Sequence, residues 1–340
     1  MRIKIGLALL FAQGIFIATA PLQAATDIAE EPGFSGYVSL GVSYADAATN
    51  QFSIDSENDT IDSLDDDPDN ASAAFPSINL SLTYTFDNLN TEVFYGDSVE
   101  DFIRFDFATL VGVRHRVEAV GIFEVVAVQT PFAAEVWEDP YLVDEEREET
   151  DRDVNGIRLQ WGRIFQSGFD LRITRREADI DDERSGDSLV AGSIITADEQ
   201  VLLDRNGDIN SARLTYVWDH GRGEQTSLSA TYLDYDLDGK AMAFDGYSLQ
   251  LSDLTAISPR MRLASNFILG KYRHDTDNPI YNERNKKDLA ALTLTLFVSD
   301  PFDFKKWIAN ATVAYAQEDN EIDFYDTTAA YFNIGLIRRF

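Results

Sequence analysis

Apolar and polar residues alternate one by one along most of the chain, and this period of two predicts β-strands. The clearest examples lie at residues 78–86, 290–296 and 307–315. Segments of about ten residues match the ~9–11 that cross a bilayer with tilt, and they exceed the ~5–6 of an ordinary soluble strand. The pattern therefore favours an all-β transmembrane antiparallel barrel over a soluble sandwich with one wet face.

The ends of these segments carry aromatic side chains, which are typical of the two membrane interfaces. Trp218 closes one apolar face, and Trp307 and Tyr315 bracket another. The chain ends on Phe340, and a terminal aromatic on an alternating last strand resembles the assembly signal of Gram-negative outer-membrane barrels. That resemblance implies the barrel-assembly machinery as a partner, although Arg338 stands where an apolar residue is expected.

Counting the segments predicts an up-and-down barrel of about fourteen strands, with twelve or sixteen as alternatives. Short connections alternate with long or acidic ones, as in bacterial barrels with short periplasmic turns, and this places both termini in the periplasm. His115 is expected in one such turn. Residues 188–195 and 200–203 are candidates for one further hairpin. The predicted strands are 36–46, 77–86, 90–97, 102–114, 116–129, 154–165, 168–177, 209–218, 225–236, 243–253, 259–273, 287–298, 306–316 and 327–340.

The first 24 residues form a predicted signal peptide. Arg2 and Lys4 precede an apolar run at 5–20, and small residues follow, with cleavage expected after Ala24. Residues 25–340 are then a single barrel domain, predicted to lie in the cell outer membrane. Only about ten residues separate the cleavage site from the first strand, which leaves no N-terminal plug of the kind expected in a fatty-acid transporter.

The charge and composition of the chain limit the classes of partner and cofactor that are expected. The 340 residues carry a net charge of −31 and no cysteine, so nucleic acid, disulfides and thiolate metal sites are not expected. Thirty-two of the 59 acids lie in four segments predicted as outer loops: 47–76, 131–153, 178–208 and 317–326. These are interpreted either as solvated loops or as sites where Ca²⁺ or Mg²⁺ bridges to outer-leaflet phosphates, with lipid and lipopolysaccharide as partners. No other cofactor is expected.

Strand parity places a set of charged residues in the lumen, opposite the apolar face. Two interpretations remain open: the acids pair with the arginines and brace the wall, or the arginines form a basic track for anionic solutes. The segment 178–208 is a candidate for a constriction that folds inward. The predicted lumen residues are Arg104, Arg158, Arg172, Arg213, Arg262, Asp106 and Asp170.

One motif suggests a cation site. Asp234, Asp236 and Asp238, followed by Gly239, match the beginning of a calcium loop, and Asp245 occupies its twelfth position. The flanking segments are strands rather than helices, so an acidic hairpin is the alternative.

Catalytic residues are few, and no enzymatic activity is expected. The chain has three histidines: His115 and His220 fall in predicted periplasmic turns, and His274 with Asp275 falls in a predicted solvated outer loop.

The opening stretch from Glu30 to Gly41, EEPGFSGYVSLG, resembles a family of exported Gram-negative proteins catalogued as a domain of unknown function. The length and the terminal Phe are similar as well. The resemblance implies an outer-membrane barrel and assigns no functional residues. The leading hypothesis is a monomeric porin-like channel for small hydrophilic solutes, with a preference for anions. The alternative is a closed barrel that acts through its acidic outer loops in adhesion or envelope stability.

Overall fold

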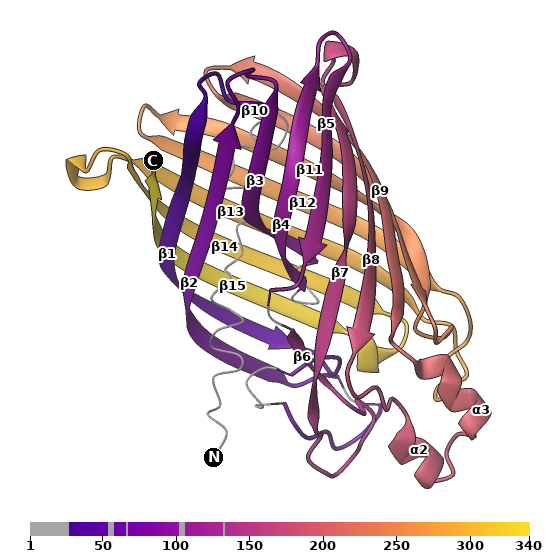
Figure 1. Ribbon diagram of the computed structural model, residues 1–340. Helices are drawn as coiled ribbons and strands as arrows, with labels where there is room; N and C mark the ends of the chain where they lie inside the picture. The colour runs from indigo at the N-terminus through magenta and orange to yellow at the C-terminus, as the bar shows by residue number, and fades with distance from the viewer. Residues whose placement is uncertain (1–26, 54–57, 66, 102–105, 132) are drawn as a thin grey trace.

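Fourteen antiparallel strands form a closed ring in the computed structural model, which describes residues 27–53, 58–65, 67–101, 106–131 and 133–340 (Figure 1). The side chains of 98–101, Asp106 and Phe107 are not described. Each strand pairs with its neighbours in the sequence, and the pairs β1–β15 and β5–β7 close the ring. A fifteenth short strand, β6, pairs with the loop end of β7, and its Val136 forms an isolated bridge with Phe52.

The strands alternate with short turns at one end and longer loops at the other. The strands are β1 (Gly33–Ala48), β2 (Asn70–Thr85), β3 (Thr91–Asp101), β4 (Asp106–Val117), β5 (Gly121–Gln129), β6 (Ala134–Trp137), β7 (Glu149–Gly162), β8 (Phe169–Ile180), β9 (Gly207–Gly221), β10 (Glu224–Leu237), β11 (Phe244–Ser258), β12 (Met261–His274), β13 (Lys286–Ser299), β14 (Trp307–Asn320) and β15 (Thr327–Arg339). The short helices are η1 (Ile164–Gln166), α2 (Asp187–Ala191), α3 (Ala197–Gln200), η2 (Val201–Leu203), η3 (Pro301–Asp303) and η4 (Asp323–Tyr325). None of the helices in the described residues has the length and apolar character needed to cross a membrane.

The fourteen predicted strands correspond one to one to the strands of the ring, so the predicted fold class is confirmed. The strands nevertheless run further into the acidic segments than predicted: β1 continues to Ala48, β2 begins at Asn70 and β7 begins at Glu149. The hydrogen-bonded ladder continues where the apolar alternation fades. The loops are correspondingly shorter than 47–76, 131–153, 178–208 and 317–326.

Two local predictions are wrong. The segment 188–195 with 200–203 forms no hairpin but contains α2, α3 and η2. A capping box explains α3, because the Thr196 side chain accepts from the Glu199 N–H while the Glu199 side chain accepts from the Thr196 N–H. His115 lies inside β4 rather than in a turn, and the turn follows at residues 118–120.

Exposure along the strands is inverted relative to a soluble protein. The outward face carries large apolar side chains that are about half exposed, including Leu40, Leu80, Ile157, Leu249, Leu292 and Ile334. The inward face carries buried polar side chains, including Ser43, Asn79, Thr174, Ser229, Thr293 and Asn310. Such an apolar belt is stable only against hydrocarbon, so the predicted outward and inward faces agree with the structure.

Several aromatic side chains lie at the turn end of the barrel. Phe169, Tyr216 and Trp218 form a run of edge-to-face contacts with ring centroids 4.6 and 4.7 Å apart. Arg338 lies over the Trp307 ring at 5.6 Å, so the basic residue that breaks the terminal pattern is paired with an aromatic of the same end. Phe340 exchanges backbone hydrogen bonds with Gly36 and fastens the chain end to β1.

The ladder between β2 and β3 is interrupted. Within the described residues these two strands pair only from Leu82–Tyr95 to Thr85–Glu92. Beyond this point the N–H of Leu80 donates to the side chain of Asp97 at 3.3 Å rather than to backbone. In an antiparallel strand, every second residue directs its backbone N–H and C=O groups to the same neighbouring strand. Pro76 is four residues from Leu80, so the position where its N–H is missing also faces β3. A proline in mid-strand is thus placed where the ladder is already absent.

Candidate functional site: a capped lumen with an internal pocket

The long loops at one end of the barrel pack together into a cap. We use this name for the described parts of 49–69, 130–148, 181–206, 238–243, 275–285 and 321–326. Their buried apolar side chains form one cluster with the loop ends of the strands, and its loop members include Tyr141, Leu189, Ile195, Leu203, Met242 and Phe324. The loops are therefore not the solvated acidic segments that their charge suggests. The acids lie around a core that charge counting does not reveal.

Arg147 fastens two of these loops. Its guanidinium donates to the carbonyl oxygens of Asn58, Asn50 and Pro140, and it lies over the Trp137 ring at 4.5 Å. Burial lowers the pKa of Arg147 to about 10, opposed by the nearby carboxylates of Asp59 and Asp139. The group stays charged at neutral pH and joins loop 49–69 to loop 130–148.

A pair of tyrosines crosses the cap. The hydroxyl groups of Tyr141 and Tyr325 lie 2.7 Å apart, and the Asn278 amide donates to the Tyr325 hydroxyl, also at 2.7 Å. Burial raises the pKa of Tyr325 to about 12 and that of Tyr141 well above its usual value. Both phenols stay protonated at physiological pH, so ionisation of the tyrosines does not break this bridge between loops.

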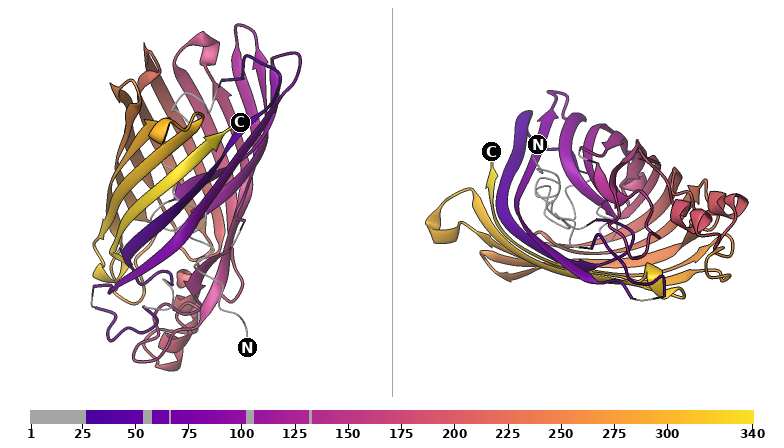
Figure 2. Two further views of the ribbon diagram at one scale, coloured as in Figure 1. Left: turned by 90° about the vertical axis from the view of Figure 1, so that its left-hand side faces the viewer. Right: turned by 90° about the horizontal axis from the view of Figure 1, so that it is seen from below.

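The helical loop 181–206 belongs to the cap and does not form the predicted constriction. Asp139 accepts hydrogen bonds from the N–H groups of Gly186 and Ser188 at 2.9 and 2.8 Å. Arg205 pairs with Glu183 at 2.7 Å. In the end-on view α2 and α3 lie at the rim of the barrel, away from its centre (Figure 2).

A single row of polar side chains crosses the inner wall below the cap. Consecutive strands β2 to β10, apart from β6, each place one member in register with the next. Glu92 and Glu124 flank Arg114 at 3.6 and 3.7 Å, so this half of the row is paired. The row reads Thr85, Glu92, Arg114, Glu124, Gln160, Arg172, Arg213, Thr231.

The other half of the row brings two like charges together. Arg172 and Arg213 are direct neighbours across β8 and β9. Arg172 donates through Nε to Gln160 at 3.0 Å, and Arg213 donates through Nε to Thr231 at 3.0 Å, so each leans away from the other. Like charges in register are unfavourable unless an anion or water lies between them.

The remaining predicted lumen residues lie elsewhere. Arg158 points inward from β7, two residues before the row member Gln160, and donates to Thr174 at 3.3 Å. Arg262 reaches the turn end, where it donates to the Gly223 carbonyl at 2.8 Å. Asp170 accepts from the Arg163 N–H at 2.6 Å in the turn before β8. Arg104 lies outside the described residues, as does the side chain of Asp106.

The residues before β1 touch this wall, although no N-terminal plug was predicted. The N–H of Ala29 donates to Glu92 at 2.7 Å, and Arg163 pairs with Asp27 at 2.6 Å. Ile28 is buried. The described segment 27–32 is thus held against the inner surface at the turn end.

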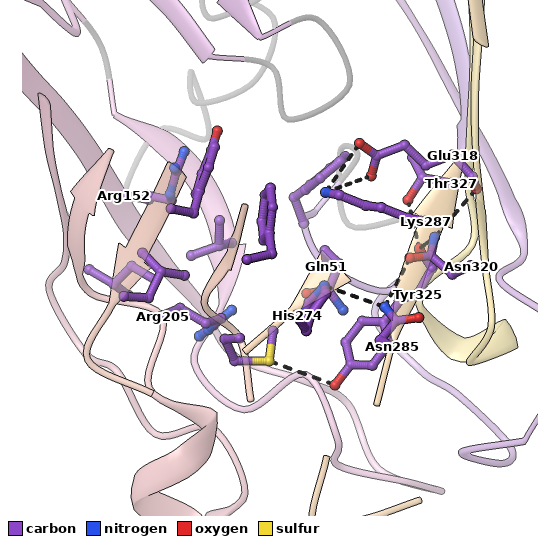
Figure 3. A pocket seen from close by; sticks show the side chains of 17 residues that line it. Gln51, Arg152, Arg205, His274, Asn285, Lys287, Glu318, Asn320, Tyr325 and Thr327 are labelled. Carbon is purple, nitrogen blue, oxygen red and sulfur yellow. Dashed lines mark hydrogen bonds and ion pairs between the residues drawn. The ribbon is translucent and has the colours of Figure 1, made fainter. Parts of the chain in front are cut away.

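A pocket of about 110 Å³ lies between the cap and the loop ends of the strands (Figure 3). Tyr235 and Phe244 stack with centroids 4.4 Å apart. The Lys287 ammonium lies 3.6 Å from the Phe244 centroid and pairs with Glu318 at 3.3 Å, both side chains being buried. Apolar and polar side chains share the lining, with eight apolar or aromatic residues and nine polar or charged ones.

His274 also lines this pocket, which corrects its predicted place in a solvated loop. It ends β12, is buried, and its Nδ1 lies 2.7 Å from the Ala241 carbonyl oxygen. The neighbouring Asp275 is exposed on the other face. The two side chains therefore do not act as one acid/base pair.

The calcium motif lies on strands. Asp234 stands opposite Asp245 across β10 and β11, and Asp236 pairs with Lys240 at 2.7 Å. Tyr235 and Leu237, which alternate with the acids, are buried. The described residues contain no group of three or more potential metal ligands, so the Asp234, Asp236, Asp238 and Asp245 site stays a prediction.

Sequence reasoning missed the acids of the row, Arg114, and the Lys287–Glu318 pair. The signal was clearest for Glu124, which has inward parity between two apolar residues, whereas Glu92 and Arg114 each have one apolar neighbour. Lys287 and Glu318 come from distant segments that only the barrel register brings together.

Comparison with known proteins adds a family. A family model described as "Protein of unknown function (DUF2860)" matches residues 33–337. No curated protein matches the chain. Similar solved structures include OmpT, an outer membrane protein of Vibrio cholerae (9% identity, 92% of this chain and 100% of that chain, TM-score 0.41) and a FadL homologue of Pseudomonas aeruginosa (10%, 89% and 90%, 0.44). An anion-selective porin from Comamonas acidovorans is a third (9%, 91% and 99%, 0.41).

Proposed function

The chain belongs to the DUF2860 family, and from its own geometry we propose that it is an outer-membrane channel for small hydrophilic solutes that prefers anions. The observation that carries the proposal is the in-register row on the inner wall, with Arg172 beside Arg213 inside a barrel whose outer face is apolar. A row with this many charges is favoured by a water-filled lumen, because buried charges are costly unless they are solvated or paired.

The charge balance of the row supports the preference for anions. It holds Arg114, Arg172 and Arg213 against Glu92 and Glu124, and Arg158 lies beside it. Arginine forks bind carboxylates and phosphates through two parallel hydrogen bonds, so a passing anion gains contacts that a cation does not.

The cap makes this a gated channel rather than an open pore. Its buried core spans the loops of the outer mouth, and Arg147 fastens two of them. A solute passes when this packing opens, so the closed state is the one described here.

Planar-bilayer recording tests the proposal. We expect rare current steps from the folded mature protein and more frequent ones from Arg147→Ala. In a salt gradient, the Arg172→Ala/Arg213→Ala double variant should lower the anion-to-cation permeability ratio about twofold or more, since charged rings set pore selectivity. Arg260→Ala, an exposed turn arginine, is the matched control and should leave the ratio unchanged. The absence of current from both the wild type and Arg147→Ala would defeat the channel.

The packing of the cap also favours a second candidate, a closed barrel that acts through its outer surface in adhesion or envelope stability. In that case the barrel conducts in neither form, and deletion changes envelope integrity instead. The further expectations of a monomer, of contacts with lipopolysaccharide and the assembly machinery, and of no enzymatic activity belong to either candidate.

A further inference from the structure

We propose that the pocket under the cap binds a small organic monoanion with a flat apolar body, its carboxylate held by Arg152. The inference rests on the proposed function, because it names the solute class that the channel would retain. It comes from the charge pairing of the pocket, from two polar groups without partners, and from the size of the cavity.

Arg152 is the cation of this pocket that lacks a partner. It lies on β7 with inward parity and is half-buried, and its side chain makes no hydrogen bond or ion pair within the described residues. Its neighbours in the lining include the apolar cluster of Phe52, Val136 and Ile180. A guanidinium in such surroundings is costly unless a counter-charge joins it.

The other charges of the pocket are compensated. Lys287 has Glu318 at 3.3 Å and the face of Phe244 at 3.6 Å, and Arg205 has Glu183 at 2.7 Å. Among the described residues one positive charge therefore remains uncompensated, which fits a ligand carrying a single negative charge. Figure 3 shows Arg152 and the Lys287–Glu318 pair on opposite sides of the pocket, so the anionic end of the ligand is directed to the Arg152 side.

A second group without a partner lies in the lining. The side-chain Nε2 of Gln51 is buried and has no hydrogen-bond partner. A buried donor of this kind is uncommon in a folded protein and costs about 1–3 kcal/mol when left unsatisfied. A carboxylate or carbonyl oxygen of the ligand would satisfy it.

The shape of the cavity limits the ligand. Its 110 Å³ compares with about 150 Å³ for an engineered apolar cavity that holds benzene. Tyr235 and Phe244 contribute aromatic ring surface to the lining. One ring or a short branched chain is the largest apolar body that this volume admits, with the carboxylate extending toward half-buried Arg152, and benzoate is the simplest probe.

Binding of benzoate to the folded mature protein in detergent tests the inference, with benzyl alcohol as the neutral analogue. Isothermal titration calorimetry should give tighter binding for benzoate than for benzyl alcohol. Arg152→Gln should weaken benzoate about tenfold or more and leave benzyl alcohol unchanged, because a hydrogen bond to a charged group is lost. Arg175→Gln, on the outer face and paired with Asp208, is the matched control. Strand circular dichroism verifies folding of each variant.

The inference is overturned if the wild type does not bind benzoate, if benzyl alcohol binds equally well, or if Arg152→Gln and Arg175→Gln behave alike. This test is separate from conductance. Benzoate binding by a barrel that never conducts would defeat the channel and keep the pocket, whereas conduction without binding would defeat the pocket alone.

Discussion

Arginine has three different roles in this chain, and position in the barrel decides which one. Arg147 donates to loop carbonyl groups inside the cap, Arg172 and Arg213 meet on the lumen wall, and Arg175 is an exposed partner of Asp208. The guanidinium is charged throughout, so its surroundings must supply acceptors or water in each place. Removing an arginine therefore has an effect that depends on burial rather than on charge alone.

At the residue scale, Arg147→Ala should loosen the cap locally while leaving the strands intact. It leaves several buried carbonyl groups without a donor, at about 1–3 kcal/mol, so amide protection in 130–148 should fall about tenfold to a hundredfold. Hydrogen exchange read by mass spectrometry measures this. Arg184→Ala is the matched control, since Arg184 is half exposed beside Glu138 and Asp182 and such pairs contribute little. Equal loss of protection in both variants would show that Arg147 does not fasten the cap.

The position of a single residue could be predicted when it depends only on the residue's neighbours in the sequence. Parity placed Arg172 and Arg213 on the inner face, because the period of a strand fixes alternate side chains without further information. His274 was misplaced because its burial depends on Ala241, in the loop 238–243, and on Phe244, which begins β11. Residues whose partners are remote in the sequence give no such signal.

At the element scale, the interruption between β2 and β3 predicts a difference between two cysteine pairs. Tyr84 and Val93 are register partners, so Tyr84→Cys/Val93→Cys should form a disulfide under mild oxidation. Ile78→Cys/Val99→Cys would be partners only if the ladder continued, and this pair should stay reduced, because a disulfide needs Cα atoms within about 7 Å. The chain has no cysteine of its own, which keeps the readout clean. Comparable cross-linking of both pairs in lipid would mean that the hydrogen-bonded ladder between β2 and β3 is continuous.

Elements were predictable where alternation is strong and failed where it is weak. All fourteen ring strands follow from period two, and their inner ends are nearly correct. The predicted strands were too short at their loop ends, since β2 begins at Asn70 and β7 begins at Glu149. The capping box of α3 was readable in the sequence, yet the apolar residues around it suggested a hairpin.

At the scale of the whole molecule, the barrel has an apolar outer belt, a polar inner row and a packed cap. The first two follow from the sequence because one residue alternation produces both. The cap does not, because its core assembles Tyr141, Leu203 and Phe324 from loops separated by many strands. The alternation therefore does not predict the packing of the cap loops that encloses the pocket.

The central claim is that alternate side chains of each strand face water inside and hydrocarbon outside, and thiol labelling in lipid nanodiscs tests it most directly. Thr215 shares the inward face with its register partner Ser229 and is only partly buried, whereas its neighbour Leu214 faces outward. With a small charged maleimide that reaches both mouths, Thr215→Cys should react and Leu214→Cys should stay unlabelled. Labelling of Leu214→Cys alone, or of both at the same rate, would contradict the account.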